Sequence, residues 1–154
     1  MDDPKRILVV SRMTQYCRKA IQSGLSLAKK YDAELYVVHA VNSPFSLAGW
    51  NFGVLFDVET QYKKLLQKTR KDLDRIIDHE KEQGMSVQVL IPQGDPTAEI
   101  IKAVKDHSID LLIMLAHEEG RLEHFLFGRS NDTIIREMPC SILMVKKEPE
   151  PVLA

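Results

Sequence analysis

Residues 5–11, Lys-Arg-Ile-Leu-Val-Val-Ser, form a continuous apolar run rich in β-branched residues. This pattern is typical of a strand that is buried on both faces of a sheet. Similar runs recur along the chain at 35–41, 87–91, 111–115 and 141–145. Because parallel neighbouring strands need crossover connections, we expect an α/β fold with a five-stranded parallel sheet and helices on both faces.

The segments between these runs carry helix signals. We expect helices at 14–30, 57–83, 98–106 and 131–137. Thr14 and Asp57 are placed to cap the first two helices, and Gly84 to stop the second. The turn 94–97, Gly-Asp-Pro-Thr, opens the third helix, and Pro139 ends the fourth. The segment 42–56 contains Pro44, Gly49 and Gly53, so we expect it to be irregular.

Length and charge restrict the classes of protein. The chain has 154 residues, which predicts one domain over 1–147 followed by a flexible tail at 148–154. Its 21 basic and 22 acidic residues argue against a nucleic-acid partner, because nonspecific binding to a polyanion needs a basic excess. No apolar run approaches the ~20 residues that span a bilayer, so we expect no membrane partner.

The cysteines and the N-terminus favour a cytoplasmic location. Cys17 and Cys140 lie far apart and neither has a CxxC partner, which indicates a reducing compartment. The N-terminus lacks the small-residue cleavage site of a secretory signal. We interpret Cys17 as a half-buried structural thiol and Cys140 as a packing residue.

No set of catalytic residues assembles in the sequence, so we expect no enzyme. The phosphate loop G-x-x-x-x-G-K-[ST], the dinucleotide fingerprint G-x-G-x-x-G and the nucleophile elbow G-x-S-x-G are all missing. The segment 117–124 holds two histidines and three glutamates, but their spacing matches no established metal site and we expect a solvated loop. His39 is expected to be a satisfied core or edge residue.

The order of elements and several motifs resemble the universal stress protein family. The motifs that carry the resemblance lie at 7–11, 35–41, 94–101, 110–114 and 138–145. The resemblance implies the family's adenine nucleotide alpha hydrolase-like fold, with strand order 3-2-1-4-5. It also implies a stress-response function and, by pairing of the last strands at Ser141 to Val145, a homodimer. A monomer whose edge is covered by the C-terminal tail is the alternative.

Many members of that family carry a nucleotide signature after the fourth strand: Gly-x-x-Gly, nine residues, then Gly-Ser or Gly-Thr. Glycines let backbone amides approach phosphates, and the hydroxyl and a helix N-terminus bind the charge. Here the first two glycines fall on Leu115 and Glu118, the third on Gly128 and the hydroxyl on Arg129. The acidic residue that follows the first strand in ATP-binding members falls on Arg12.

These departures predict that ATP is not bound in the family's usual way, so we expect no cofactor. At ~4 Å and an effective dielectric near 20, a carboxylate at Glu118 would cost about 4 kcal/mol against one phosphate charge. The alternative is ATP or another adenine nucleotide. The resemblance assigns the degenerate nucleotide site to Val10, Arg12, Val41, Met114, Leu115, His117, Glu118, Gly128, Arg129, Ser130 and Asn131.

A rebuilt anion site is a second interpretation of the same region. Arg12, Arg121 and Arg129 would converge there on phosphate or carboxylate. We favour solvated surface arginines, some of them paired with neighbouring glutamates. The function we expect is therefore a non-catalytic regulatory or interaction module, with a sensor of a nucleotide or other anionic metabolite as the alternative.

The aromatic residues are unevenly distributed. All five Phe and the only Trp lie within 45–56 and 125–127. The segment 42–56 is therefore too apolar for a plain solvent loop. It has three candidate roles, as a cap over the cleft, a dimer patch or a docking site for a partner protein, beside the simpler role of packing on the long helix.

Overall fold

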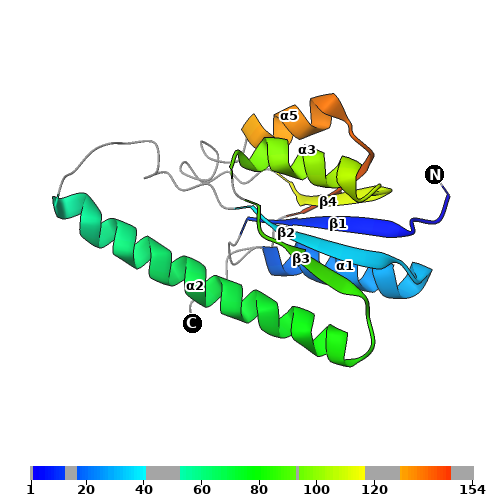
Figure 1. Ribbon diagram of the computed structural model, residues 1–154, viewed down its shortest axis with the longest axis horizontal. Coiled ribbons are helices and arrows are strands. Elements are labelled where there is room, and N and C mark those ends of the chain that lie inside the picture. The colour runs from blue at the N-terminus through cyan, green and yellow to red at the C-terminus, as the bar shows by residue number, and fades with distance from the viewer. Residues whose placement is uncertain (1, 13–16, 41–52, 93, 117–128, 147–154) are drawn as a thin grey trace.

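The computed structural model describes residues 2–12, 17–40, 53–92, 94–116 and 129–146 (Figure 1). Its elements are β1 (Arg6–Ser11), α1 (Cys17–Tyr31), β2 (Glu34–His39), α2 (Gly53–Glu82), β3 (Val87–Leu90), α3 (Pro96–Asp106), β4 (Leu111–Leu115), α5 (Arg129–Glu137) and β5 (Ser141–Val145).

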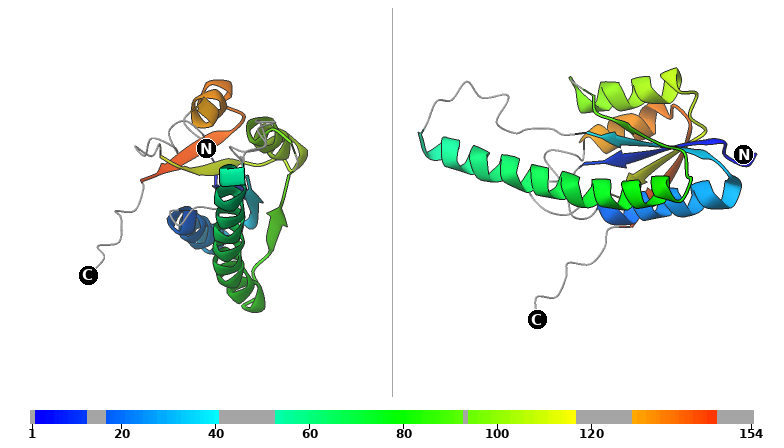
Figure 2. Two further views of the ribbon diagram at one scale, coloured as in Figure 1. Left: turned by 90° about the vertical axis from the view of Figure 1, so that its left-hand side faces the viewer. Right: turned by 60° about the horizontal axis from the view of Figure 1, so that its bottom comes forward.

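The strands form one parallel sheet in the order β3-β2-β1-β4-β5. This confirms the expected fold class and strand order. Helices α1 and α2 cover one face of the sheet, and α3 and α5 cover the other (Figures 1 and 2). The strand β1 therefore lies at the centre of three layers, and β3 and β5 form the two edges.

The hydrophobic core has two parts, one on each face of the sheet, and alternate residues of a strand contribute to opposite parts. On β1, Ile7 and Val9 belong to the cluster under α1 and α2, whereas Leu8 and Val10 belong to the cluster under α3 and α5. All four are almost completely buried. Burial on both faces explains why the strand reads as a continuous apolar run.

The helix α1 packs very close to the sheet, and Gly24 makes this possible. A Cβ atom added at Gly24 would overlap with Cγ2 of Val9 and press on Cδ1 of Leu35 at 3.2 Å. The contact surface of α1 is therefore fitted to β1 and β2 at this glycine.

The helix boundaries differ from the sequence prediction at the N-terminal ends. Helix α2 begins at Gly53, so Asp57 lies inside it and is not its cap, and 53–56 are helical instead of irregular. The stretch after Gly53 contains no proline, and this allows the helix to extend toward the N-terminus. Helix α5 begins at Arg129, two residues early. The expected cap Thr14 lies outside the described residues.

Helix α3 begins at Pro96 and has a complete N-terminal cap. The carboxylate of Asp95 accepts a hydrogen bond from the Ala98 backbone N–H at 2.8 Å, and Pro96 occupies the first turn. At the end of α2, Gly84 has a φ of 91°, which is the left-handed conformation of a helix stop and confirms that prediction.

The strand boundaries agree closely with the sequence. Strands β4 and β5 have the expected limits, and β2 and β3 end slightly earlier, at His39 and Leu90. Among the described helices, none combines the length and the apolar character needed to cross a membrane. The predictions for the tail 148–154, for 42–52 and for the loop 117–124 lie outside the described residues.

Candidate functional site

Arg12 lies at the carboxyl end of β1, which is where ligands bind in open parallel sheets. Its side chain is buried, with 8% of the residue exposed. Its Nη2 atom donates to Oγ of Ser130 at 2.9 Å and to Oδ1 of Asn131 at 3.2 Å. The expectation of a solvated surface arginine was therefore wrong for Arg12, because polar groups from a distant helix surround it.

Ser130 and Asn131 connect this arginine to two further elements. Nδ2 of Asn131 donates to the carbonyl oxygen of Leu115, the last residue of β4, at 3.2 Å. Oγ1 of Thr97, in the first turn of α3, donates to Oγ of Ser130 at 2.6 Å. We call these five residues the Arg12 cluster, and it joins β1, β4, α3 and α5 at one end of the sheet.

The cluster contains the buried positive charge of the Arg12 guanidinium. Burial lowers the pKa of Arg12 to about 10, while the nearby Cys17 and Asp95 act to raise it. Arg12 remains protonated at neutral pH. It lies beside the N-terminus of α5, where helix dipoles contribute further positive potential. Guanidinium has donors only, so this position cannot accept a hydrogen bond from a sugar hydroxyl.

The structure brings together only part of the predicted nucleotide site. Arg12, Ser130, Asn131 and the backbone of Leu115 meet directly. Val10 and Met114 are buried neighbours on the α3 and α5 face of the sheet. The positions outside the described part are Val41, His117, Glu118 and Gly128, together with Arg121 and the side chain of Arg129.

Thr97 is the member of the cluster that is not among the predicted site residues. The sequence does contain a pattern that points to Thr97, because the Gly-Asp-Pro-Thr turn opens α3 at the same edge of the sheet. A hydroxyl in the first turn of that helix faces the carboxyl ends of the strands. The pairing with Ser130, 33 residues away, depends on the packing of α3 against α5.

The two cysteines are free. Cys17 is completely buried instead of half-buried, and its Sγ accepts a hydrogen bond from the Arg12 backbone N–H at 3.1 Å. Cys140 is partly buried beside the α3 and α5 core, as its packing role predicts, and burial raises the pKa of its thiol. The described residues contain no group of three potential metal ligands.

His39, at the end of β2, is buried but not satisfied. It is 1% exposed, and neither ring nitrogen makes a hydrogen bond with another described residue. Its Nε2 lies 3.8 Å from Oδ1 of Asp74 on α2, which is too long for one. The expectation of a satisfied histidine was therefore wrong. Burial lowers the pKa of His39, with Asp74 opposing this effect and Arg70 adding to it.

Known proteins resemble this chain over nearly its whole length. The profile described as the universal stress protein family matches residues 4–146. Universal stress protein MJ0577 of Methanocaldococcus jannaschii is 28% identical, and the match covers 94% of this chain and 96% of that protein. Universal stress protein MJ0531 of the same organism is 24% identical, with coverage of 93% and 82%.

Solved structures show the same fold. The structure of MJ0577 has a TM-score of 0.67 at 21% identity and covers 95% of this chain and 98% of its own. A universal stress protein family protein from Arabidopsis thaliana, solved with AMP bound, has a TM-score of 0.59 at 18% identity, with coverage of 97% for both chains. With the parallel sheet in its order 3-2-1-4-5, these matches lead to one conclusion: the chain belongs to the universal stress protein family.

Proposed function

We propose that this chain is a non-catalytic regulatory module of the stress response that acts in the cytoplasm as a homodimer. We further propose that it does not bind ATP in the way of the family's nucleotide-binding members. One observation carries the second proposal: Arg12, at the position to which the family resemblance assigns the acidic residue of ATP-binding members, is a buried and hydrogen-bonded guanidinium.

The hydrogen bonds of the Arg12 cluster support this proposal in physical terms. A bound nucleotide needs free donors for its phosphates and an acceptor for its sugar. Ser130 and Asn131 direct their oxygens to Arg12, and Asn131 directs its amide N–H to Leu115. Binding ATP there would require these bonds to break, which costs about 0.5–1.5 kcal/mol each and more if buried groups are left unpaired.

A second candidate function is the binding of a different anion in the same cleft. The buried positive charge of Arg12 favours it, because arginine suits two-point contacts with phosphate or carboxylate. The Arabidopsis relative was solved with AMP, and another relative was solved in complex with cAMP. Monophosphates of this kind are therefore the first anions to screen.

Isothermal titration of the chain with ATP and magnesium tests the proposal directly. We expect no saturable heat up to millimolar ATP. A parallel thermal-shift screen with AMP, cyclic AMP, inorganic phosphate and carboxylate metabolites separates the two functions. Stabilisation by one of these anions that is lost in Arg12→Met supports the sensor, whereas micromolar affinity for ATP with magnesium contradicts both proposals.

The proposed dimer rests on the exposed edge of β5. Leu143 and Met144 are 37% and 38% exposed there, and Ile135 and Met138 of the adjoining α5 region are 39% and 55% exposed. We call these four residues the β5 edge surface. Exposed apolar edge strands are normally paired or covered, and a second copy of the same strand would pair this one.

A further inference from the structure

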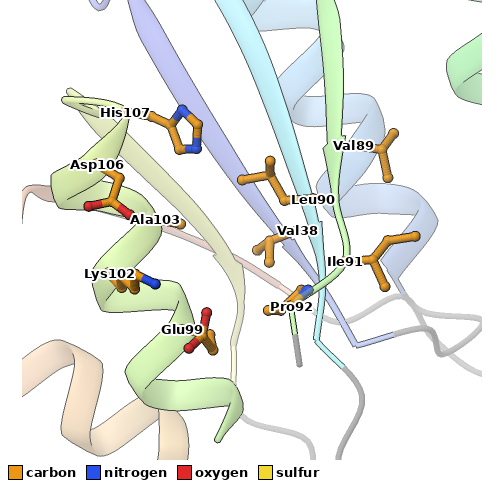
Figure 3. Close-up of a pocket in the computed structure, with 10 residues that line it drawn as sticks. All are labelled: Val38, Val89, Leu90, Ile91, Pro92, Glu99, Lys102, Ala103, Asp106 and His107. Atoms are coloured by element: carbon orange, nitrogen blue, oxygen red, sulfur yellow. The ribbon is translucent and has the colours of Figure 1, made fainter. Parts of the chain in front are cut away.

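A groove of about 310 Å³ opens between α3 and the edge strand β3 (Figure 3). Its floor is apolar and includes Val38 and Leu90, with Pro92 at one end. Its wall is the face of α3 formed by Glu99, Lys102, Ala103 and Asp106, together with His107 directly after the helix. The groove shares no residue with the Arg12 cluster, so it is a separate feature of the molecule.

The groove exists because α3 covers the centre of the sheet and not its edge. Ile100, Ile101 and Val104 of α3 pack in the core with side chains of β1, β2 and β4. Leu90 of β3 is only half-buried and Gln88 is exposed. Among the described residues, no helix lies over this side of β3 (Figure 2).

The backbone of β3 is available on its outer side. The Leu35 N–H donates to the Ser86 carbonyl oxygen at 3.1 Å, and β2 and β3 are parallel. This register turns the backbone groups of Gln88 and Leu90 toward β2 and those of Val87 and Val89 outward. In the described part of the chain, β3 pairs with β2 alone.

The side chains of β3 do little to prevent pairing with another strand. Edge strands are commonly protected by lysine, inward charges or proline within the strand. The strand reads Val-Gln-Val-Leu and contains none of these, although it is short and Pro92 follows it closely. Beside it, Ile91 is 50% exposed.

The charged side chains along the groove favour a partner with basic side chains. Glu99, Lys102 and Asp106 follow one another at helical spacing on one face of α3, and none forms an ion pair with another described residue. Two carboxylates thus flank one ammonium. The C-terminus of α3, at the Asp106 end, adds negative dipole potential. The groove is acidic at both ends and apolar on its floor.

We propose that β3 and this groove bind an extended peptide segment of a partner protein, added to the sheet as a further strand. Its alternate side chains would be basic, apolar and basic. The apolar one would cover Leu90, and the basic ones would approach Glu99 and Asp106. These two residues lie about 10 Å apart along α3, and the two basic residues, four positions apart in a strand, lie about 13 Å apart, a difference that long basic side chains can span. Two basic side chains on either side of the apolar one can therefore reach both carboxylates.

Fluorescence anisotropy with the full chain tests this proposal. The probe is a fluorescein-labelled peptide, Thr-Lys-Val-Leu-Val-Arg-Thr, and the comparison peptide carries Glu in place of Lys and Arg. We expect the basic peptide to bind at least about tenfold more tightly, a difference of ~1.4 kcal/mol. Equal binding of the two peptides, or no binding of either at millimolar concentration, would overturn the proposal.

Matched variants distinguish the groove from a general charge effect. The double variant Glu99→Gln/Asp106→Asn should weaken binding of the basic peptide about tenfold. The control Glu82→Gln/Glu137→Gln changes the net charge equally at exposed positions on α2 and α5, and should bind like the unchanged chain. Equal weakening by both variants would overturn the proposal. Circular dichroism confirms that each variant is folded.

Amide hydrogen exchange identifies the mode of binding. Saturation with the basic peptide should slow exchange at Val87 and Val89, whose N–H groups face outward, because an added strand supplies them with acceptors. Binding without this protection would contradict strand addition. A fall in the molecular mass of the free chain on Ile91→Glu would instead identify a second copy as the occupant and overturn the peptide proposal.

Discussion

Nη2 of Arg12 and Oγ of Ser130 lie 2.9 Å apart, although 118 residues separate them in the sequence. This hydrogen bond joins the end of β1 to the first turn of α5. From the sequence alone, Arg12 would be expected to be solvated. In the structure its buried side chain instead links the sheet to α5.

Replacing Arg12 should therefore reduce stability. Arg12→Met keeps much of the side-chain volume but leaves Oδ1 of Asn131 without its donor, and we expect a loss of about 1–3 kcal/mol in the free energy of unfolding. Urea denaturation measures it. The matched control is Arg136→Met, at an exposed position on α5, which should change stability by less than about 0.5 kcal/mol. Equal effects of the two variants would show that the buried hydrogen bonds contribute nothing.

Thr97 should contribute through its hydroxyl alone. Thr97→Val keeps the shape but removes the donor to Ser130, so we expect a loss of about 0.5–1.5 kcal/mol in the free energy of unfolding. Thr97→Ser restores the hydroxyl and should recover part of that loss. If the serine variant is no more stable than the valine variant, the bond between the two hydroxyls is not the cause.

His39 should make the protein less stable in mild acid. Burial lowers its pKa below the ordinary 6.5, so the folded state binds fewer protons than the unfolded state. The stability of the neutral, buried ring is fully present above about pH 6.5. It is lost progressively as the pH falls from there toward the lower pKa of the folded protein.

The variant His39→Leu tests this dependence. Between about pH 7.5 and 5, the free energy of unfolding should fall less in this variant than in the unchanged chain. Stability near neutral pH should be retained, because an apolar side chain replaces two unsatisfied nitrogens. His79→Leu, at an exposed position of α2, is the control for replacing a histidine by leucine. The same slope in His39→Leu and the unchanged chain would contradict the prediction.

The oligomeric state should depend on one edge of the sheet and not the other. Leu143→Glu places a charge in the β5 edge surface, and we expect the molar mass from light scattering to fall from that of a dimer to that of a monomer. Ile91→Glu places the same charge beside β3, on the opposite edge, and should leave the dimer intact. An unchanged chain that is already monomeric at micromolar concentration would refute the β5 dimer.

The glycine between α1 and the sheet should not tolerate a methyl group. Gly24→Ala places a carbon against Cγ2 of Val9, and we expect it to cost about 1–3 kcal/mol despite the higher helix propensity of alanine. Ser26→Ala, exposed on the same helix, should be neutral or slightly stabilising. Thermal denaturation of both variants compares them. A stabilised Gly24→Ala would mean that α1 shifts freely away from β1.

The sequence predicts the sheet well because each strand is a short, continuous apolar run, and the central strands β1, β2 and β4 are buried on both faces. Strands β4 and β5 have the expected limits, and the order of strands follows from the family resemblance. The start of α2 was harder to predict, because Asp57 is a good cap residue and nothing in the local pattern shows that the helix continues to Gly53. Capping residues in the sequence indicate several possible helix ends, and tertiary packing determines which of them is observed.

The environments of single polar residues are largely hidden from the sequence. Arg12 follows an apolar strand and looks like a residue that enters solvent, but Ser130 and Asn131 come from another part of the chain. His39 looks like an ordinary strand residue, and its lack of hydrogen bonds depends on where α2 places Asp74. Such long-range placements decide burial and pKa, and one sequence contains no direct signal for them.

The strand order determines where the peptide-binding edges of the proposed dimer would lie. Because β3 and β5 occupy opposite edges, two copies joined at β5 would carry their β3 strands at the far ends of one continuous sheet, about 43 Å apart at the usual strand spacing. Such an assembly is bivalent, because its two β3 edges both face outward. It would hold a single peptide weakly but a clustered array of the same peptide with strong avidity, so crowding of the target would control its occupancy.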